Sequence, residues 1–391
     1  MKKLLALVLA LVMSMSLVTI SNAAFKDADK ISNKEAVDVM AAVGVLAGYD
    51  NGEFGATDTL TRAQACKIIA YLDLGKDVAE ALPAVQVFSD LPASNWAAKY
   101  VAYCADAGYV SGVGDNKFAP DEKVTGYQFG KMLLCALGYD QKVEEMTGSS
   151  WEIKVAKLME KNSLSKGTSK LGSAALTREE AAQYGLNALK ATCVEYDEKG
   201  STIIAGDVTI INGAKKAKAV ECAEDYSKVI DETVGSTTSV WTVQLGEKLY
   251  KGDLTLAATG AATSDDFGRP VKTWEYKNAE VATSVTSAKA VFTADTKADD
   301  VVKALKGYKF NGTELKDKDT QIGSTTTAID SLTFSAATDK IAEKVADLTA
   351  NGKVVEFYAD SNKNINKIVV IEYTFDKVAN VSTNNKGKTT Y

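Results

Sequence analysis

Apolar residues follow a helical spacing in the first half of the chain and alternate with polar residues in the second half. A helix is predicted from Arg62 to about Leu72, because its apolar positions recur three and four residues apart. Beyond residue 200, short runs rich in Thr and Val predict strands at 202–211, 240–245, 254–258, 271–276, 354–358 and 368–375. Two helices are expected among them, at about 297–305 and 339–348.

The helical half contains one unit that occurs three times. At an offset of 64 residues, Gly48 matches Gly112, Phe54 matches Phe118 and Thr61 matches Thr125. A more degenerate third copy runs from Trp151 to Leu189. Each copy is predicted to form a helix, a glycine-bearing loop and a second helix. A unit this small cannot bury its apolar face alone, so the three copies are expected to pack into one body.

The second helix of each copy is predicted to begin at a capping box. In this motif a Thr and a Gln or Glu three residues later satisfy two backbone N–H groups. The boxes start at Thr61, Thr125 and Thr177. A further box is expected at Ser32–Glu35, and Gly48 is expected as the left-handed residue that ends the first helix.

Arginine is rare, and its placement is selective. Only three of the 45 basic residues are Arg, and two of them, Arg62 and Arg178, directly follow the Thr of a capping box. The middle copy has Gly126 instead. A cation in the first helical turn opposes the helix dipole at a cost of about 0.3–1 kcal/mol, so capping does not explain it. A guanidinium can make two parallel bonds to a carboxylate, which makes both residues candidate ligands for an acidic group; a surface ion pair is the alternative.

The amino end has the pattern of a secretory signal peptide. Two lysines, an apolar stretch and small residues predict a leader at 1–24, cleaved before Phe25, and hence an exported protein. No later segment has the roughly 18 apolar residues of a membrane span. Without Lys2 and Lys3, 43 basic residues face 51 acidic ones, a net charge of about −8, which disfavours nucleic acid as a partner.

Composition also excludes several kinds of chemistry. The chain has no His, which excludes Ser-His-Asp nucleophiles and His-ligated metals. Its five Cys cannot all pair; buried thiols are expected, with one disulfide as the alternative. The spacing Asp360–Asn364 predicts a plain turn rather than a calcium loop, and Arg269 is expected to form an ion pair within a loop. We therefore expect no catalytic residues, no metal and no cofactor.

Residues 25–195 resemble the S-layer homology (SLH) family. The resemblance depends on the Phe-x-Asp openings at Phe25–Asp27 and Phe88–Asp90, on Trp96 and Trp151, on the Gly48–Phe54 loop, and on Thr61–Gln64. It implies three tandem repeats, at about 25–75, 88–140 and 150–192. It also implies an all-α pseudo-trimer, in which three helices form a central bundle and the others form prongs. The multidomain chain would continue at 200–391 with one or two β-rich domains for surface assembly.

In that family the grooves between prongs hold a secondary cell-wall polysaccharide, often pyruvylated. The resemblance carries the following glycan-binding roles to this chain: Arg62 and Arg178 hold carboxylates, Asp27 and Asp90 are groove polar groups or structural caps, Trp96 and Trp151 are aromatic walls or core, and Gly48 and Gly112 allow close backbone approach. The third copy lacks the Asp-Asn-Gly turn, and the second lacks the Arg. One or two competent grooves are therefore expected rather than three.

These observations favour a non-enzymatic cell-surface protein. It would be held at the cell wall by polysaccharide, with a β-rich region that assembles into a lattice or faces outward. The alternatives are an anchored polysaccharide hydrolase that uses paired carboxylates, or an anchored adhesin. The hydrolase is disfavoured because the second half is small and has only Trp241 and Trp274 as indole side chains.

Overall fold

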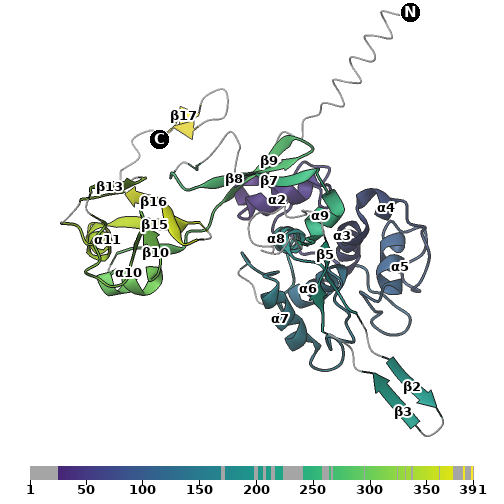
Figure 1. Cartoon of the computed structure of the whole chain (residues 1–391). Coiled ribbons are helices and arrows are strands. Elements are labelled where there is room, and N and C mark those ends of the chain that lie inside the picture. Colours follow the sequence, from purple (N-terminus) through teal and green to yellow (C-terminus); the bar gives the residue numbers. More distant parts are fainter. Residues whose placement is uncertain are drawn as a thin grey trace, which may run out of the picture. The chain divides into compact units, whose positions relative to one another are not determined.

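The computed structural model describes residues 25–168, 172–197, 201–205, 208–212, 216–222, 241–257, 264–265, 267–294, 296–323, 325–330, 332–335, 338–360, 362–372, 382–383 and 389–390 (Figure 1). The predicted leader lies outside these residues. The chain forms two compact units, Met1–Ala261 with Lys272–Ser284, and Ala262–Val271 with Val285–Tyr391. Helices dominate the first unit and strands the second, as the sequence predicts.

The first unit contains a short 3₁₀ helix and most of the α-helices. They are η1 (Ala28–Lys30), α2 (Lys34–Ala42), α3 (Arg62–Leu74), α4 (Lys76–Glu80), α5 (Ala98–Asp106), α6 (Gly126–Ala136), α7 (Trp151–Lys161), α8 (Arg178–Lys190) and α9 (Leu245–Tyr250). The capping boxes predicted at Thr61, Thr125 and Thr177 are confirmed at the starts of α3, α6 and α8. In each box both reciprocal hydrogen bonds are present.

A closed ring of backbone hydrogen bonds joins the three segments that lead into these boxes. The N–H of Leu60 donates to the carbonyl of Leu176 at 2.8 Å, that of Leu176 donates to Val124 at 2.9 Å, and that of Val124 donates to Leu60 at 3.0 Å. The three side chains are buried. The ring therefore fixes the starts of α3, α6 and α8 beside one another, at the centre of a shared apolar core.

Two local predictions in the first copy are wrong. Helix α2 begins at Lys34, and Glu35 does not close a box with Ser32. The Glu35 carboxylate instead accepts hydrogen bonds from Trp274 Nε1 at 2.8 Å and Lys190 Nζ at 3.2 Å, and these longer-range partners prevail over the local cap. Because α2 ends at Ala42, the left-handed residue after it is Gly44, with φ of 75°, rather than Gly48.

The core of the first unit extends past the boundary that the sequence suggests near residue 200. Leu245 of α9, Leu254 of β7 (Leu254–Ala257) and Trp274 of β8 (Val271–Tyr276) are fully buried in the same apolar cluster as the repeat helices. Strand β9 (Ala279–Val285) completes a three-stranded sheet, β7-β8-β9. The apolar residues of this segment thus pack against the helices as well as each other.

Short strand pairs complete the first unit. They are β1 (Val194–Glu195) with β4 (Lys218–Ala219), β2 (Ser201–Ala205) with β3 (Val208–Asn212), and β5 (Glu221–Cys222) with β6 (Trp241–Thr242). The single strand predicted at 202–211 is therefore a hairpin. The strand predicted at 240–245 is wrong beyond Thr242, because Gln244 caps α9.

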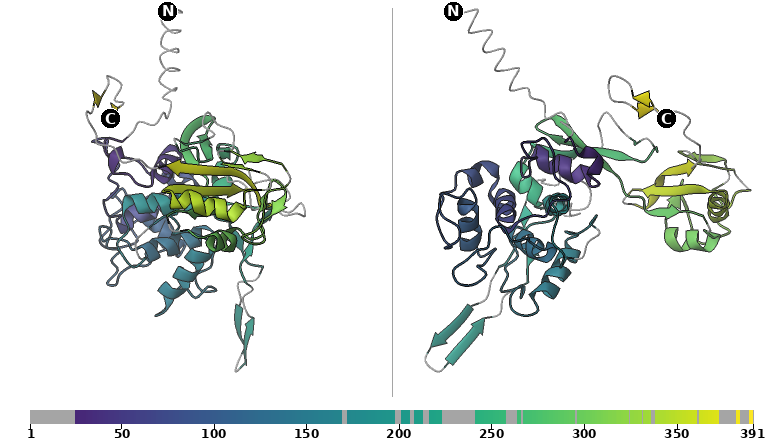
Figure 2. Two further views of the ribbon diagram at one scale, coloured as in Figure 1. Left: turned by 90° about the vertical axis from the view of Figure 1, so that its left-hand side faces the viewer. Right: turned by 180° about the vertical axis from the view of Figure 1, so that it is seen from behind.

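The second unit has a five-stranded sheet in the order β10-β15-β16-β11-β12. Its strands are β10 (Ala290–Phe292), β11 (Lys309–Phe310), β12 (Thr313–Glu314), β15 (Lys353–Ala359) and β16 (Asn364–Glu372); the pairs β13 (Thr327–Ile329) with β14 (Leu332–Phe334) and β17 (Ser382–Thr383) with β18 (Thr389–Thr390) lie outside it. Only β11 and β16 pair in parallel within this sheet. Helices α10 (Ala298–Leu305) and α11 (Ile341–Ala350) lie on the same face of it (Figure 2). A buried cluster rich in Phe fills the interior.

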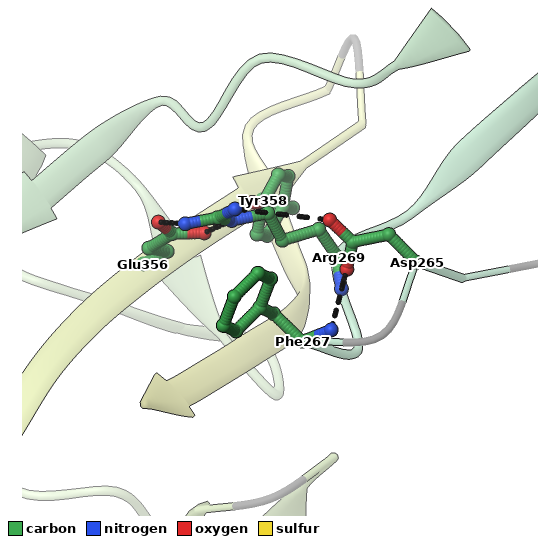
Figure 3. A network of polar contacts seen from close by, with 5 residues as sticks. All are labelled: Asp265, Phe267, Arg269, Glu356 and Tyr358. Atoms are coloured by element: carbon green, nitrogen blue, oxygen red, sulfur yellow. Dashed lines mark hydrogen bonds and ion pairs between the residues drawn. The ribbon is translucent and has the colours of Figure 1, made fainter. Parts of the chain in front are cut away.

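Arg269 forms the predicted ion pair, and its partner lies on the sheet (Figure 3). Its Nε and Nη2 donate to the two carboxylate oxygens of Glu356 at 2.8 and 2.9 Å. Glu356 is 6% exposed and also accepts from the Tyr358 hydroxyl at 2.6 Å. The Asp265 carboxylate accepts the backbone N–H of Arg269 and so fixes the loop. This guanidinium is thus fully engaged inside the second unit.

Other predictions can be tested on the described residues alone. Cys66, Cys104, Cys135 and Cys193 are buried and free, as expected. The Asp360 carboxylate accepts hydrogen bonds from the N–H groups of residues 362 and 364, which confirms the plain turn. Within the described ranges, no group of acidic or Cys side chains could hold a metal, and no helix is long and apolar enough to cross a membrane.

Candidate functional site

Two pockets of the first unit are built from equivalent residues. The Arg178 groove, of about 370 Å³, is lined by Arg178, Gln64, Lys67 and Trp96 together with neighbouring backbone. The Arg62 groove, of about 300 Å³, is lined by Arg62, Gln128, Lys131 and Trp151. Gln128 and Lys131 lie 64 residues after Gln64 and Lys67. Each groove therefore combines an Arg, a capping-box Gln, a Lys and a Trp drawn from different copies of the repeat.

Backbone hydrogen bonds explain why each Arg lies at a groove. Both are the first residue of a helix, directly after the Thr cap. The backbone N–H of Arg62 donates to the carbonyl of Glu122, and that of Arg178 donates to Asp58, both at 2.8 Å. A residue at this position has no partner for its N–H within its own helix, so the bond comes from a neighbouring copy. The start of the helix is thereby positioned beside the next loop.

The two guanidinium groups make the same contacts. Arg178 Nε donates to the carbonyl of Phe54 at 2.9 Å, and its Nη2 donates to Ala47 at 2.6 Å. Arg62 Nε donates to Phe118 at 3.0 Å, and its Nη2 donates to Ser111 at 2.8 Å. Phe118 and Ser111 lie 64 residues after Phe54 and Ala47. Each Arg thus ties its own helix to the loop of another copy.

These contacts leave part of each guanidinium for other partners. Two of the five N–H donors are engaged by the described backbone, and three remain, including both on Nη1. Burial lowers the pKa of both Arg62 and Arg178, yet an Arg side chain stays protonated at any physiological pH. The grooves therefore each present a permanent cation with free donors, which suits a carboxylate.

Asp27 and Asp90 fix loops and do not line either groove. Asp27 accepts the backbone N–H of Phe54 at 2.7 Å and of Gly55 at 2.9 Å. Asp90 accepts the equivalent N–H groups of Phe118 and Ala119, both at 2.8 Å. Burial would raise the pKa of both carboxyls, but these backbone bonds outweigh it and lower the pKa. Because the carbonyls of Phe54 and Phe118 hold the two Arg side chains, each Asp supports one groove indirectly.

The two glycines are sites of close packing within the protein. A Cβ on Gly48 would lie 2.7 Å from the Phe25 ring and 2.9 Å from the carbonyl of Glu53. A Cβ on Gly112 would lie 2.7 Å from the carbonyl of Lys117. Gly48 does line the Arg178 groove, whereas Gly112 does not line the Arg62 groove. Both glycines therefore serve the loop first.

The two tryptophans lie in equivalent grooves but in different environments. Trp96 is 54% exposed and leans on Tyr100, with ring centroids 6.4 Å apart. Trp151 is half-buried and packs against the core, and Lys131 Nζ lies 5.8 Å from the centre of its ring. Trp96 is thus the more accessible surface for a ligand.

Sequence reasoning missed the lysines and one carboxylate. Lys67 and Lys131 match at the repeat offset, a signal that the capping motif overshadows. Glu80 lines the Arg178 groove, and hydrogen bonds from Lys99 and then Tyr71 lower its pKa to about 2. Glu80 comes from α4, a five-residue helix after Gly75 that the repeat pattern does not mark.

The position that corresponds to these Arg residues in the middle copy is closed. A Cβ on Gly126 would lie 3.0 Å from the Tyr184 hydroxyl and 3.1 Å from Gly172 Cα. The Tyr127 ring lies directly against Gly172, and its N–H donates to the Gly172 carbonyl at 2.7 Å. Gln183 stands where the other copies have Lys67 and Lys131. Loss of the Arg therefore coincides with packing that fills the space.

Comparison with known proteins agrees with this repeat structure. The family described as S-layer homology domain matches residues 24–66 and 87–129, which cover the first and second copies. A surface-layer 125 kDa protein of Lysinibacillus sphaericus is 28% identical over 379 residues, 90% of this chain and 30% of its own. The middle cell wall protein of Brevibacillus brevis is 27% identical over 209 residues, 52% of this chain and 19% of its own.

A cellulosome-anchoring protein of Acetivibrio thermocellus is 33% identical over 110 residues, 28% of this chain and 24% of its own. The chain thus spans at most 30% of the length of these three relatives. Their shared feature is the repeat region, and their names are those of cell-wall and surface-layer proteins. The chain belongs with the S-layer homology repeat proteins of the bacterial cell surface.

Proposed function

We propose that the first unit holds the protein non-covalently at the cell wall, by binding an acidic secondary cell-wall polysaccharide in the Arg178 and Arg62 grooves. The observation that carries this proposal is that the same four side chains recur in both grooves. An Arg and a Lys supply positive charge in a protein that is acidic overall, and the Trp supplies an apolar face for a sugar ring. A pyruvyl ketal, which is a carboxylate on a sugar, is the acidic group we propose.

We also propose that the three copies form the SLH pseudo-trimer, with α3, α6 and α8 as the central bundle. The closed hydrogen-bond ring through Leu60, Val124 and Leu176 supports this arrangement. Two grooves would be competent and the third would not, because Gly126 replaces the Arg. The direct glycan ligands would be the Arg, Lys and Trp side chains, with Asp27, Asp90, Gly48 and Gly112 in supporting roles.

Binding to purified cell-wall sacculi of the producing bacterium tests the anchoring role. Wild-type protein should sediment with sacculi and remain soluble when the covalently attached polysaccharide has been removed from them. Arg62→Lys with Arg178→Lys should abolish sedimentation, since Lys cannot form the paired bonds. Arg269→Lys is the matched control, because that guanidinium is engaged by Glu356 in the second unit.

The Arg residues also hold loops together, so a second pair of variants separates binding from folding. Lys67→Gln with Lys131→Gln removes the other cation of each groove and none of the loop contacts. This variant should keep the wild-type melting temperature and bind sacculi at least 10-fold more weakly, about the effect of losing two charge-assisted bonds. Wild-type binding by both double variants, or equal binding to stripped sacculi, would contradict the proposal.

For the β-rich residues we propose a structural role in surface-layer assembly or display, without enzymatic activity. The names of the relatives support it, since they are surface-layer and cell-wall proteins. Electron microscopy of the purified chain provides the test. Ordered two-dimensional sheets are expected for an assembling protein, whereas persistent monomers would favour an adhesin.

A further inference from the structure

A second pocket adjoins the Arg178 groove and is built largely by residues that follow the repeats. This adjoining pocket has a volume of about 430 Å³ and lies between the α3–α4 junction, the turn after α9 and the β8–β9 hairpin. The residues that matter here are Gly44, Lys76, Asp77, Asp253, Tyr276 and Lys277. All of them belong to the first unit.

The adjoining pocket is continuous with the groove. Gly44 and Lys76 line both cavities. Gly44 has φ of 75°, and the position that a Cβ would take there lies 3.1 Å from Lys76 Nζ. Only a flexible Lys side chain therefore lies across the junction, above bare backbone. A polymer held at Arg178 could continue over Gly44 without meeting a fixed side chain.

The lining of the adjoining pocket suits sugar hydroxyls. Lys76 and Lys277 are exposed and form no ion pair with a described residue. Asp77 and Asp253 add acceptors of the opposite charge, and Tyr276 adds a half-buried ring. The shape does not depend on a loose loop, because Lys277 N–H donates to the carbonyl of Asp253 at 2.7 Å and the Tyr276 ring packs edge-on against Tyr250. Donors and acceptors on one surface are what an uncharged sugar residue requires.

The Arg62 groove has no such extension among the described residues. Gly108, which corresponds to Gly44, is covered by Gln141, whose Nε2 donates to the Gly108 carbonyl. A Cβ on Gly108 would lie 2.9 Å from that nitrogen. Asp140 stands where the first copy has Lys76. The two grooves are therefore equivalent at the Arg and different at this end.

We propose that the adjoining pocket is an extra saccharide subsite, which binds the sugar residues next to the one held by Arg178. It makes the Arg178 groove a site for a long polysaccharide chain, while the Arg62 groove binds a single acidic residue and its immediate neighbours. This inference rests on the proposed anchoring function. It adds that residues outside the repeats, at 253 and 276–277, select chain length.

Polysaccharide released from sacculi and separated into long chains and single repeat-unit fragments is the probe. The variant is Lys277→Asn with Asp77→Asn, which removes one cation and one anion and so keeps the net charge. Asn also tolerates the left-handed backbone of Lys277, whose φ is 52°. Lys157→Gln with Glu160→Gln, an exposed pair on α7 that lines neither cavity, is the control.

Titration calorimetry should show that the variant binds long chains about 3- to 10-fold more weakly and fragments as tightly as wild type. The control should match wild type with both probes. Equal long-chain affinity in variant and wild type, with Arg178→Lys still weakening both probes, would overturn the subsite and leave the anchoring function standing. Wild-type protein that bound neither probe would overturn the anchoring function and the subsite together.

Discussion

The Arg178 groove and the Arg62 groove share a frame and differ at the rim. In both, the Arg donates to two loop carbonyls in the same pattern. At the rim, Arg178 lies over two rings, those of Tyr49 and Phe54, at 4.6 and 5.0 Å, whereas Arg62 lies over Phe118 alone, at 4.5 Å. The repeat thus conserves the contacts that position the cation and allows the surface that meets the ligand to diverge within one chain.

Removal of the carboxylate behind one groove should damage that groove first. Asp27→Ala leaves the N–H groups of Phe54 and Gly55 without partners, and Asp90→Ala does the same to Phe118 and Ala119. Each substitution should lower the free energy of unfolding of the first unit by about 3 kcal/mol, since two buried donors lose their bonds. Chemical denaturation measures this loss.

The pH dependence of the same variants is a further check on the Asp clamps. Backbone bonds lower the pKa of Asp27 and Asp90 in the folded state, so each stabilises the fold above the pKa of the unfolded chain, near 4. This stabilisation should disappear as pH falls through the lower folded pKa. Wild type and variants should therefore converge in stability toward pH 2. A gap that stayed constant between pH 7 and pH 2 would contradict a carboxylate role.

Restoration of the missing Arg should fail to create a third groove. Gly126→Arg places a side chain against Tyr184 and Gly172, where a Cβ alone is already within 3.1 Å of its neighbours. We expect a loss of about 1–3 kcal/mol in unfolding free energy from overpacking and no additional binding site in calorimetry. Gly126→Ala is the control for the first carbon. A rise in stoichiometry would show that the Arg is the one element missing from that copy.

The repeats and caps were readable from the sequence because they depend on local hydrogen bonds. Thr61, Thr125 and Thr177 each satisfy N–H groups within three residues, so spacing alone predicts them. Glu35 shows the limit, since its partners Trp274 and Lys190 lie far away in the sequence and override the expected cap.

The same limit applies to the candidate site. The motif located Arg62 and Arg178, but it did not show that half of each guanidinium edge is occupied by backbone carbonyls. Such carbonyls belong to every residue type and leave no mark in the sequence. Residues 245–276 were assigned to the β-rich half for a related reason, because strand periodicity does not reveal that Trp274 packs with helices.

Single Arg substitutions should separate the two grooves. Arg178→Lys should weaken glycan binding about 10-fold at the Arg178 groove only, and Arg62→Lys at the other only, because each loses one paired contact. Trp fluorescence can report each site: Trp96 in a Trp151→Phe chain, and Trp151 in a Trp96→Phe chain. The expected result is loss of response at the reporter that shares the groove. If both reporters lost their response in either variant, the grooves would be coupled rather than independent.

The smallest effect should come from the one carboxylate that only the Arg178 groove has. Glu80→Gln removes a negative charge from the cavity that is proposed to hold an acidic sugar, and so should raise affinity there by about 2- to 3-fold, as befits an exposed charge screened by solvent. Hydrogen bonds from Lys99 and Tyr71 lower the pKa of Glu80 to about 2, so the carboxylate is ionised throughout pH 5 to 8. The gain should therefore be constant over that range and absent at the Arg62 groove. Weaker binding instead would mean that Glu80 serves the ligand by orienting Lys99 and Lys67, and the two grooves would then differ in how they hold the sugar as well as in how far they extend.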